Sequence, residues 1–181
     1  LPLWSEALDS AAAEEQLAEA GLQNPAQAYK RLLDLRHGGQ VRAMQRLGRE
    51  RLDAFMPRLL AQAVSQPDPD LVLERVMPLV EKVARRSAYL VLLSENPGAL
   101  QRLLSLCAAS PWIAQQIARF PLLLDELLNE GRLFSPPQGE ELVAELRERL
   151  MRIPEDDLEQ QMEALRPFAL SHSLQIATTE I

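Results

Sequence analysis

Apolar residues recur along this chain with the period of an α-helix. Leu100, Leu103, Leu104 and Cys107 follow one another at steps of three and four positions. Such spacing gathers side chains on one face of a helix, whereas a half-buried strand alternates apolar and polar residues. No segment of the chain shows that alternation. The pattern therefore predicts helices throughout.

Five dipeptides place a capping residue directly before a proline. The side-chain oxygen of Asn, Asp or Ser accepts a backbone N–H at a helix start, and proline at the first helical position loses no hydrogen bond. These dipeptides predict five helix starts, at Asn24-Pro25, Asp68-Pro69, Asn96-Pro97, Ser110-Pro111 and Ser135-Pro136.

Taken together, periodicity and punctuation predict helices near residues 4–9, 11–20, 25–36, 40–65, 69–95, 97–109, 111–119, 121–129, 138–152 and 155–181. Gly21 and Gly131 are expected to end helices. Pro57, Pro78 and Pro167 fall inside three of the patterns and are expected to kink or split them. Linkers are expected at residues 66–68 and 131–139, the second of them exposed.

The composition supports a helical fold. Leu and Ala supply 35 and 23 of the 181 residues, whereas Val, Ile and Thr together supply 15. Leu and Ala favour helices, and the β-branched residues favour strands. We therefore predict an all-α fold, a bundle of about eight to ten helices, several of them kinked by proline. No apolar run reaches the roughly 18 residues of a membrane span, so no membrane partner is expected.

Charge is distributed unevenly. The net charge of −7 disfavours nucleic acid as a partner. Residues 30–58 carry eight basic and three acidic side chains, and residues 140–163 carry nine acidic and three basic ones. Arginines of the basic stretch form either a solvated face or a face that docks on an acidic partner. The candidate interaction face comprises Arg36, Arg42, Arg46, Arg49 and Arg58, with Arg42, Arg46 and Arg49 on one side of the predicted helix 40–65.

No motif predicts a catalytic, cofactor-binding or metal site. Gly38-Gly39 lacks the Lys-Ser or Lys-Thr of a phosphate loop and is interpreted as a turn. Asp68-Pro69-Asp70 is the only Asp-x-Asp; on a strand it could hold a metal ion, but here it is typical of a helix start. The acidic run Glu155-Asp156-Asp157 is interpreted in the same way.

The remaining titratable candidates are explained by structural roles. Cys107 completes a leucine stripe and is predicted to be a small core residue rather than a nucleophile. His37 and His172 are too few for a zinc site. His172 continues an apolar stripe and is predicted to be partly buried and hydrogen-bonded. The apolar final segment, with Leu170, Leu174, Ala177 and Ile181, is expected to face a missing domain.

One long stretch resembles a known family. Residues 87–128 read SAYLVLLSENPGALQRLLSLCAASPWIAQQIARFPLLLDELL. They closely resemble the bifunctional adenylyltransferase/deadenylylase of bacterial glutamine synthetase. RIPEDD at 152–157, EQQMEALR at 159–166 and LQIA at 174–177 resemble the same family, as does DAFMPRLL at 53–60 more weakly.

The resemblance implies a place in a longer protein. Proteins of this family have two nucleotidyltransferase units joined through helical regions. By resemblance, residues 1–66 are the end of the helical region after the first unit, and residues 67–181 are a linker and lead-in to the second, adenylyltransferase unit. Both ends of the chain look cut, which fits an internal fragment. The family's catalytic pattern, a Gly pair followed by a strand bearing Asp-x-Asp, is absent, so no catalytic residue is carried over.

The resemblance also implies a function for the parent enzyme. That enzyme would use ATP and Mg²⁺ to transfer AMP to a tyrosine of glutamine synthetase in the cytoplasm, and would remove it by phosphorolysis. Glutamine and the PII signal protein would set the direction. We expect this chain to bind no cofactor itself and to be a non-catalytic linker and regulatory segment that couples the two active sites, in contact with the flanking domains. The alternatives are a module that binds PII or glutamine synthetase directly, a passive spacer, and a self-contained enzyme.

Overall fold

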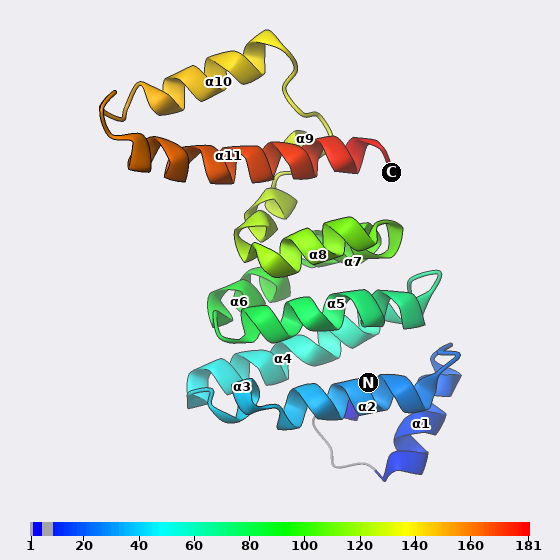
Figure 1. The fold of residues 1–181 in the computed structure, drawn as a ribbon. Coiled ribbons are helices and arrows are strands. Elements are labelled where there is room, and N and C mark those ends of the chain that lie inside the picture. Colours follow the sequence, from blue (N-terminus) through cyan, green and yellow to red (C-terminus); the bar gives the residue numbers. More distant parts are fainter. Residues whose placement is uncertain (1, 5–8) are drawn as a thin grey trace. The chain divides into compact units, whose positions relative to one another are not determined.

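The computed structural model describes residues 2–4 and 9–181, and every element in that part of the chain is helical (Figure 1). The predicted all-α fold is confirmed, with eleven α-helices and two 3₁₀ helices among the described residues. The predicted helix at 4–9 lies mostly outside them. In chain order the elements are η1 (Pro2–Trp4), α1 (Ser10–Glu19), α2 (Pro25–His37), α3 (Gly39–Arg42), α4 (Arg46–Ala63), α5 (Pro69–Ala84), α6 (Ser87–Glu95), α7 (Pro97–Ala109), α8 (Pro111–Arg119), η2 (Pro121–Leu128), α9 (Glu130–Leu133), α10 (Glu140–Leu150) and α11 (Leu158–Thr179).

Four of the five cap–proline dipeptides start a helix as predicted. Asp68 accepts the N–H of Leu71, and Ser110 accepts the N–H of Ile113, while α2 and α7 begin at their prolines without a side-chain cap. The start predicted at Ser135 is wrong. Pro137 follows Pro136 and disfavours a helical conformation there, so α10 begins only at Glu140.

Two long predicted helices are each divided. The segment 40–65 forms α3 and α4, and the chain turns at Gln45, whose φ of −65° and ψ of 156° are extended. The segment 69–95 forms α5 and α6, separated at residues 85–86. By contrast, Pro57, Pro78 and Pro167 do not split their helices, which continue past each proline. Their kinks stay a prediction.

The glycine predictions have opposite outcomes. Gly21 ends α1 with φ at +97°, its N–H bonded to the carbonyl of Ala18, while the N–H of Leu22 bonds the carbonyl of Leu17. This pair of bonds is the Schellman motif, and Leu17 and Leu22 are both buried. Gly131 instead lies inside α9, so the predicted helix end there, and the linker over 131–133, are wrong.

The chain divides into two compact units, residues 1–124 and residues 125–181. The predicted domain boundary between residues 66 and 67 came from the family resemblance, and it stays a prediction. In the first unit, α4 and α5 on either side of residue 66 pack against each other. No helix in the described part of the chain is long and apolar enough to cross a membrane.

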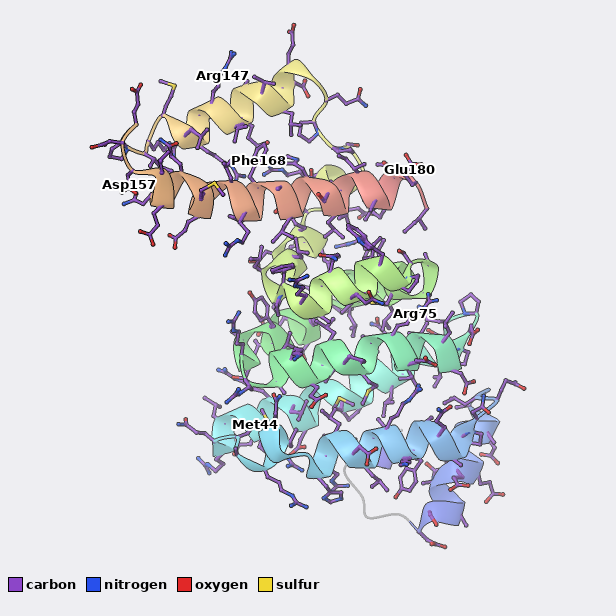
Figure 2. All side chains as sticks on the ribbon, viewed as in Figure 1. Met44, Arg75, Arg147, Asp157, Phe168 and Glu180 are labelled. Atoms are coloured by element: carbon purple, nitrogen blue, oxygen red, sulfur yellow. The ribbon has the colours of Figure 1, made fainter. Side chains whose placement is uncertain are left out.

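Helix α5 lies at the centre of unit 1. It packs against α2 on one side and α8 on the other, and it also contacts α4, α6 and α7 (Figure 1). Its buried residues form one broad face of about 160° around the helix, at 100° per residue. Arg75 of α5 donates to the carbonyls of Cys107 and Ala108, which satisfies the free end of α7 with a cation where the helix dipole favours one (Figure 2).

Unit 2 is built on the longest helix of the described chain, α11. Helix α10 leads into α11 through residues 151–157, and both α10 and α9 pack against α11. Thr178 donates to the carbonyl of Leu133 at 2.7 Å, and Gln175 donates to Glu126 at 2.9 Å. These bonds fix the second half of α11 against the start of the unit.

Replacing Gly21 with Ala should destabilise unit 1 by about 1–2 kcal/mol, because a residue with Cβ is strained in the left-handed conformation. Both tryptophans, Trp4 and Trp112, lie in unit 1, so urea unfolding followed by tryptophan fluorescence reports on it. Gly39→Ala is the matched control, since a Cβ there meets nothing within 4 Å and φ is not positive. Equal midpoints for the two variants would contradict the role of the motif.

Candidate interaction surface

The predicted arginine face is distributed over more than one helix. Arg42 ends α3, whereas Arg46 and Arg49 lie in the first turn of α4. The expectation that these three share one side of a single helix is wrong, because the turn at residues 43–45 separates them. Arg36 lies in the last turn of α2, and Arg58 lies later in α4.

Two of these arginines hold the fold together. Arg49 Nε lies 3.2 Å from Asp53 Oδ1, which also accepts the indole N–H of the buried Trp4 at 2.8 Å. Arg58 donates to the carbonyl of Ser94 in α6 at 2.6 Å. Arg49 therefore belongs to the contact between η1 and α4, and Arg58 to the contact between α4 and α6.

The other three are not engaged in this way. Within the described part of the chain the side chains of the half-buried Arg36 and the exposed Arg42 make no ion pair or hydrogen bond. Arg46 lies 3.6 Å from Glu50 with 92% of its side chain exposed, and an ion pair so exposed to water contributes little. Of the predicted face, Arg36, Arg42 and Arg46 are thus the members available to a partner, and their role in binding stays a prediction.

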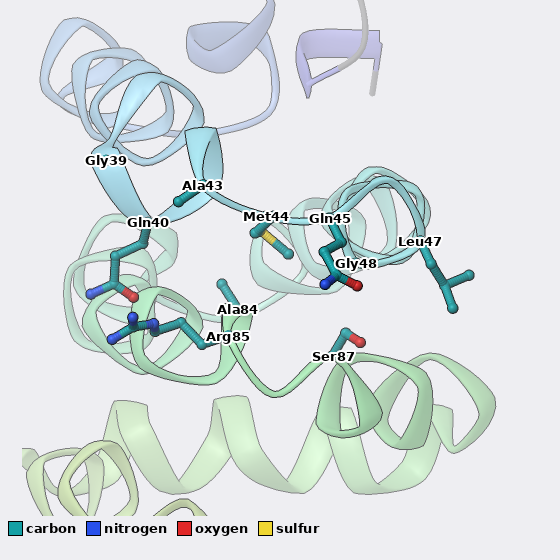
Figure 3. Close-up of a pocket in the computed structure, with 10 residues that line it drawn as sticks. All are labelled: Gly39, Gln40, Ala43, Met44, Gln45, Leu47, Gly48, Ala84, Arg85 and Ser87. Carbon is teal, nitrogen blue, oxygen red and sulfur yellow. The ribbon is translucent and has the colours of Figure 1, made fainter.

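A pocket of about 600 Å³ opens in unit 1, and Ala43, the residue after Arg42, is part of its lining (Figure 3). Its walls are the turn between α3 and α4, the first turn of α4, the end of α5 and the start of α6. Met44 and Leu47 supply apolar wall, and Gln40, Arg85 and Ser87 supply polar groups. Leu47 is 56% exposed. The volume lies within the range of small-molecule and peptide side-chain pockets.

Sequence reasoning missed the second half of this pocket. Arg85, which lines it, and the adjacent Arg86 are both exposed and make no side-chain ion pair or hydrogen bond. They stand more than 40 positions from Arg42, so no local charge count joins them. The available signal was the Arg85-Arg86 doublet at the end of an apolar-periodic segment, which marks a break between helices.

The carboxylates of the Asp-x-Asp motif are both used as helix-start acceptors. Asp68 accepts the N–H of Leu71 at 3.0 Å, and Asp70 accepts the N–H groups of Gln23 at 2.6 Å and Asn24 at 2.9 Å. The two side chains serve the starts of different helices, α5 and α2. They do not fit a pair of ligands for the Mg²⁺ that the family resemblance implies, and no group of three or more His, Cys, Asp or Glu side chains suited to a metal occurs among the described residues.

Cys107 is a core residue, as predicted. It is fully buried, and this burial raises the pKa of its thiol to about 12 against the opposing charge of Arg75. A thiol with such a pKa is not a nucleophile at neutral pH. His37 ends α2 and is exposed. Asp157 caps α11 by accepting the N–H of Gln160, so the acidic run precedes a helix start as predicted, although α11 begins at Leu158 rather than 155.

His172 is more buried than expected, with 4% of the residue exposed. Neither ring nitrogen makes a hydrogen bond, so that part of the prediction is wrong. Its Nε2 lies 3.5 Å from Glu145 Oε2, and its ring contacts Phe168 edge-on with centroids 4.4 Å apart. The guanidinium group of Arg149 lies over the ring of Phe168, with its carbon 5.2 Å from the ring centroid.

Glu145 is the centre of this cluster in unit 2. It accepts hydrogen bonds from Arg132 of α9 and Arg149 of α10, both at 2.8 Å. Burial acts to raise the pKa of Glu145, but the hydrogen bond from Arg149 and the charges of Arg132 and His172 outweigh it, so its pKa lies below the usual 4.5. The carboxylate thus joins α9, α10 and α11. The loop 134–139 beyond α9 is largely exposed, as predicted for that part of the linker.

Comparison with known proteins identifies the family. Residues 100–181 match the glutamate-ammonia ligase adenylyltransferase family. Over all 181 residues the chain is 75% identical to the bifunctional glutamine synthetase adenylyltransferase/adenylyl-removing enzyme of Pseudomonas aeruginosa. It is 73% identical over 180 residues to the enzyme of the same name from Pseudomonas putida, and 48% identical over 179 residues to that of Thioalkalivibrio sulfidiphilus.

The chain therefore belongs to the glutamate-ammonia ligase adenylyltransferase family, as the resemblance indicated. It corresponds to one segment of these enzymes, since it spans 18% of the length of each of the three relatives.

Asp70→Ala should destabilise unit 1 by about 1–2 kcal/mol, because two backbone N–H groups lose a charged acceptor. Urea unfolding followed by tryptophan fluorescence measures the change. Asp9→Ala is the matched control, since Asp9 precedes α1 without a side-chain cap. Addition of Mg²⁺ should leave the unfolding midpoint of the unsubstituted chain unchanged. A Mg²⁺-dependent rise in this midpoint that Asp70→Ala abolishes would contradict a purely structural role of Asp70.

Glu145 should make unit 2 less stable in acid. A carboxyl whose pKa is lowered by folding stabilises the fold above its unfolded pKa, and this stabilisation is lost as the pH falls through the folded pKa. The protection of the α11 amides against hydrogen exchange, relative to an unfolded chain at the same pH, should therefore fall below about pH 4.5. In Glu145→Gln this protection should already be lower at neutral pH and should change less with acid. A pH profile identical to that of the parent chain would exclude this role.

Proposed function

We propose that this chain is a non-catalytic linker and regulatory segment of an enzyme that adds AMP to glutamine synthetase and removes it. In this role it couples the two opposed active sites through contacts with the flanking catalytic units. The 75% identity to a bifunctional enzyme over the whole chain supports the assignment to such a protein. The two separately packed helical units support a structural and regulatory role.

The observation that carries the regulatory part is a set of three arginines of unit 1, of which Arg85 lines the pocket while Arg42 and Arg86 are adjacent in sequence to residues that line it. Arg42, Arg85 and Arg86 are exposed and are not engaged inside the unit. They add little to its stability, and guanidinium groups bind carboxylates or phosphates in a bidentate manner. This basic surface therefore suits a contact with an acidic surface elsewhere in the enzyme, in glutamine synthetase or in PII.

Coupling requires that the contact differ between two states of the enzyme. A contact made equally in both states would hold the units together without regulating them. The test must therefore compare the balance of the two activities, and its response to effectors, rather than either rate alone.

The experiment uses the Pseudomonas aeruginosa enzyme carrying this 181-residue sequence in place of its matching segment. Reversing the charge of Arg42 and Arg85 should leave both basal rates within about twofold, because neither residue is placed in catalysis. The shift in the ratio of AMP addition to AMP removal that PII and glutamine produce should shrink by about 5- to 100-fold, the range of ordinary coupling energies. Rates of both reactions are measured with and without each effector.

Lys30→Glu provides the matched control, since Lys30 is also exposed in unit 1 but lies on α2 away from the pocket lining. An unchanged response in the Arg42/Arg85 variant would favour the passive spacer. Loss of both basal rates would point to a structural rather than a regulatory contact.

A direct binding module is the second candidate, favoured by the size and mixed lining of the same pocket. Calorimetric titration of this chain with glutamine synthetase, and with PII in its plain and uridylylated forms, distinguishes it from a linker. Saturable binding that is lost on Arg42→Glu would identify a receiver of the signal. Absence of heat with every partner, from a chain shown to be helical by circular dichroism, would leave the linker.

A further inference from the structure

Helix α11 carries an apolar stripe that packs on nothing in the described structure. Leu158, Met162 and Ile176 are 70%, 64% and 52% exposed, and Ala169 between them is exposed as well. At 100° per residue these four positions fall within about 40° of one another around the helix. They form a continuous line about 27 Å long, from 1.5 Å of rise per residue. We call Leu158, Met162, Ala169 and Ile176 the α11 stripe.

The unit has already used the other side of α11. Phe168, His172, Leu174, Gln175 and Thr178 are buried. At 100° per residue four of them lie about 80° or more from the line through Leu158 and Ile176, whereas His172 lies about 40° from that line and borders the stripe. The expectation that Leu174 faces a missing domain is wrong, because Leu174 is buried. The α11 stripe is the exposed apolar part of the same helix.

The shape of the stripe fits another helix. Met162, Ala169 and Ile176 repeat every seven residues, the spacing by which one helix presents a seam to another. The small Ala169 in the middle permits a close approach of the two axes. At 100° per residue the exposed Glu180 falls on the line of the stripe, Glu159 lies about 60° from its edge, and Glu163 lies about 100° from it, against the single Arg166 at about 40°. None of these three carboxylates forms an ion pair within the described part of the chain. The fitting partner is thus an amphipathic helix with an apolar seam and basic flanks.

The chain's relatives indicate where such a helix comes from. This chain spans 18% of their length, so most of the polypeptide in those enzymes lies outside the matching segment. An exposed apolar seam on a soluble domain marks a surface that another domain covers. We propose that in the complete enzyme the α11 stripe packs against a helix from outside these 181 residues. That helix has an apolar seam flanked by basic residues. This inference rests on the family assignment and not on the regulatory role proposed above.

Thiol labelling tests the proposal in two contexts. The single native thiol, Cys107, is buried, so Met162→Cys and Ile176→Cys each add one reactive reporter. Both variants are prepared in the isolated chain and in the Pseudomonas aeruginosa enzyme that carries this chain in place of its own segment. Maleimide should label both sites in the isolated chain at the rate of an exposed thiol. In the complete enzyme it should label them about tenfold more slowly, because a covered thiol reacts only when the contact opens.

Gln115→Cys on α8 is the matched control, since Gln115 is exposed in unit 1 and should react at similar rates in both contexts. Equal labelling of Met162→Cys in the isolated chain and in the complete enzyme would overturn the proposal. Sedimentation of the isolated chain tests whether a second copy of this chain covers the stripe instead. A dimer that dissociates in Met162→Lys would show that it does, and would also overturn the proposal.

A stability measurement adds a readout independent of the reporters. Met162→Lys and Ile176→Lys should leave the unfolding of the isolated chain unchanged, because both side chains are solvated there. In the complete enzyme the same substitutions should lower the melting temperature, and Glu163→Lys, outside the stripe, should lower it less than Met162→Lys. An unchanged melting temperature for both stripe variants in the complete enzyme would count against a covered seam. Because none of these readouts uses PII or glutamine, their outcome is independent of the regulatory proposal.

Discussion

The fold of unit 1 depends on the burial of α5 between its neighbours. Valines and leucines line one broad face of this helix, and Val72, Val76 and Val80 are all at most 2% exposed. Each such side chain contributes roughly 1.5–3 kcal/mol on full burial. Since α2, α4, α6, α7 and α8 all contact α5, the position of each of them is set largely by this one helix. Arg75 of this helix is partly buried and donates to the carbonyls at the end of α7.

This arrangement sorts the arginines of the unit into two kinds. Arg58 and Arg75, on the sides of helices, bind carbonyl groups of a neighbouring helix, and Arg49 binds Asp53 of its own helix. Arg42, the last residue of α3, and Arg85, directly after α5, are exposed, and Arg85 lines the pocket. Arginines next to the breaks between helices are therefore left exposed and available for binding. A charge count along the sequence cannot separate these two kinds, because the distinction lies in the packing.

The sequence predicted the helical class and most helix starts, because proline and its preceding cap act within a few residues. It did not predict the breaks at 43–45 and 85–86, because the helices on each side bury residues in the same core and the apolar period runs on across the turn. Nor did it bring the end of α5, with Arg85, to the pocket that α3 also lines, since that arrangement arises from packing of α3 on α5. Asp70 was correctly associated with a helix start, but the helix it serves is α2, a contact across 46 positions.

Unit 2 shows why local burial and available surface must be considered together on one helix. On one side of α11, His172 and Glu145 join a polar cluster that is closed by Arg132 and Arg149, so that side is complete within the unit. The neighbouring seam through Met162 and Ile176 is exposed and has no such closure. A helix that is apolar on two sides satisfies only one of them in a two-layer hairpin, and the second favours a further layer of structure. The same asymmetry holds in unit 1, where the core is complete but the arginines at the helix breaks are not engaged. Both units thus have packed cores, and each exposes side chains that are available for binding. These are the properties expected of a segment that works through contacts with other parts of a longer protein.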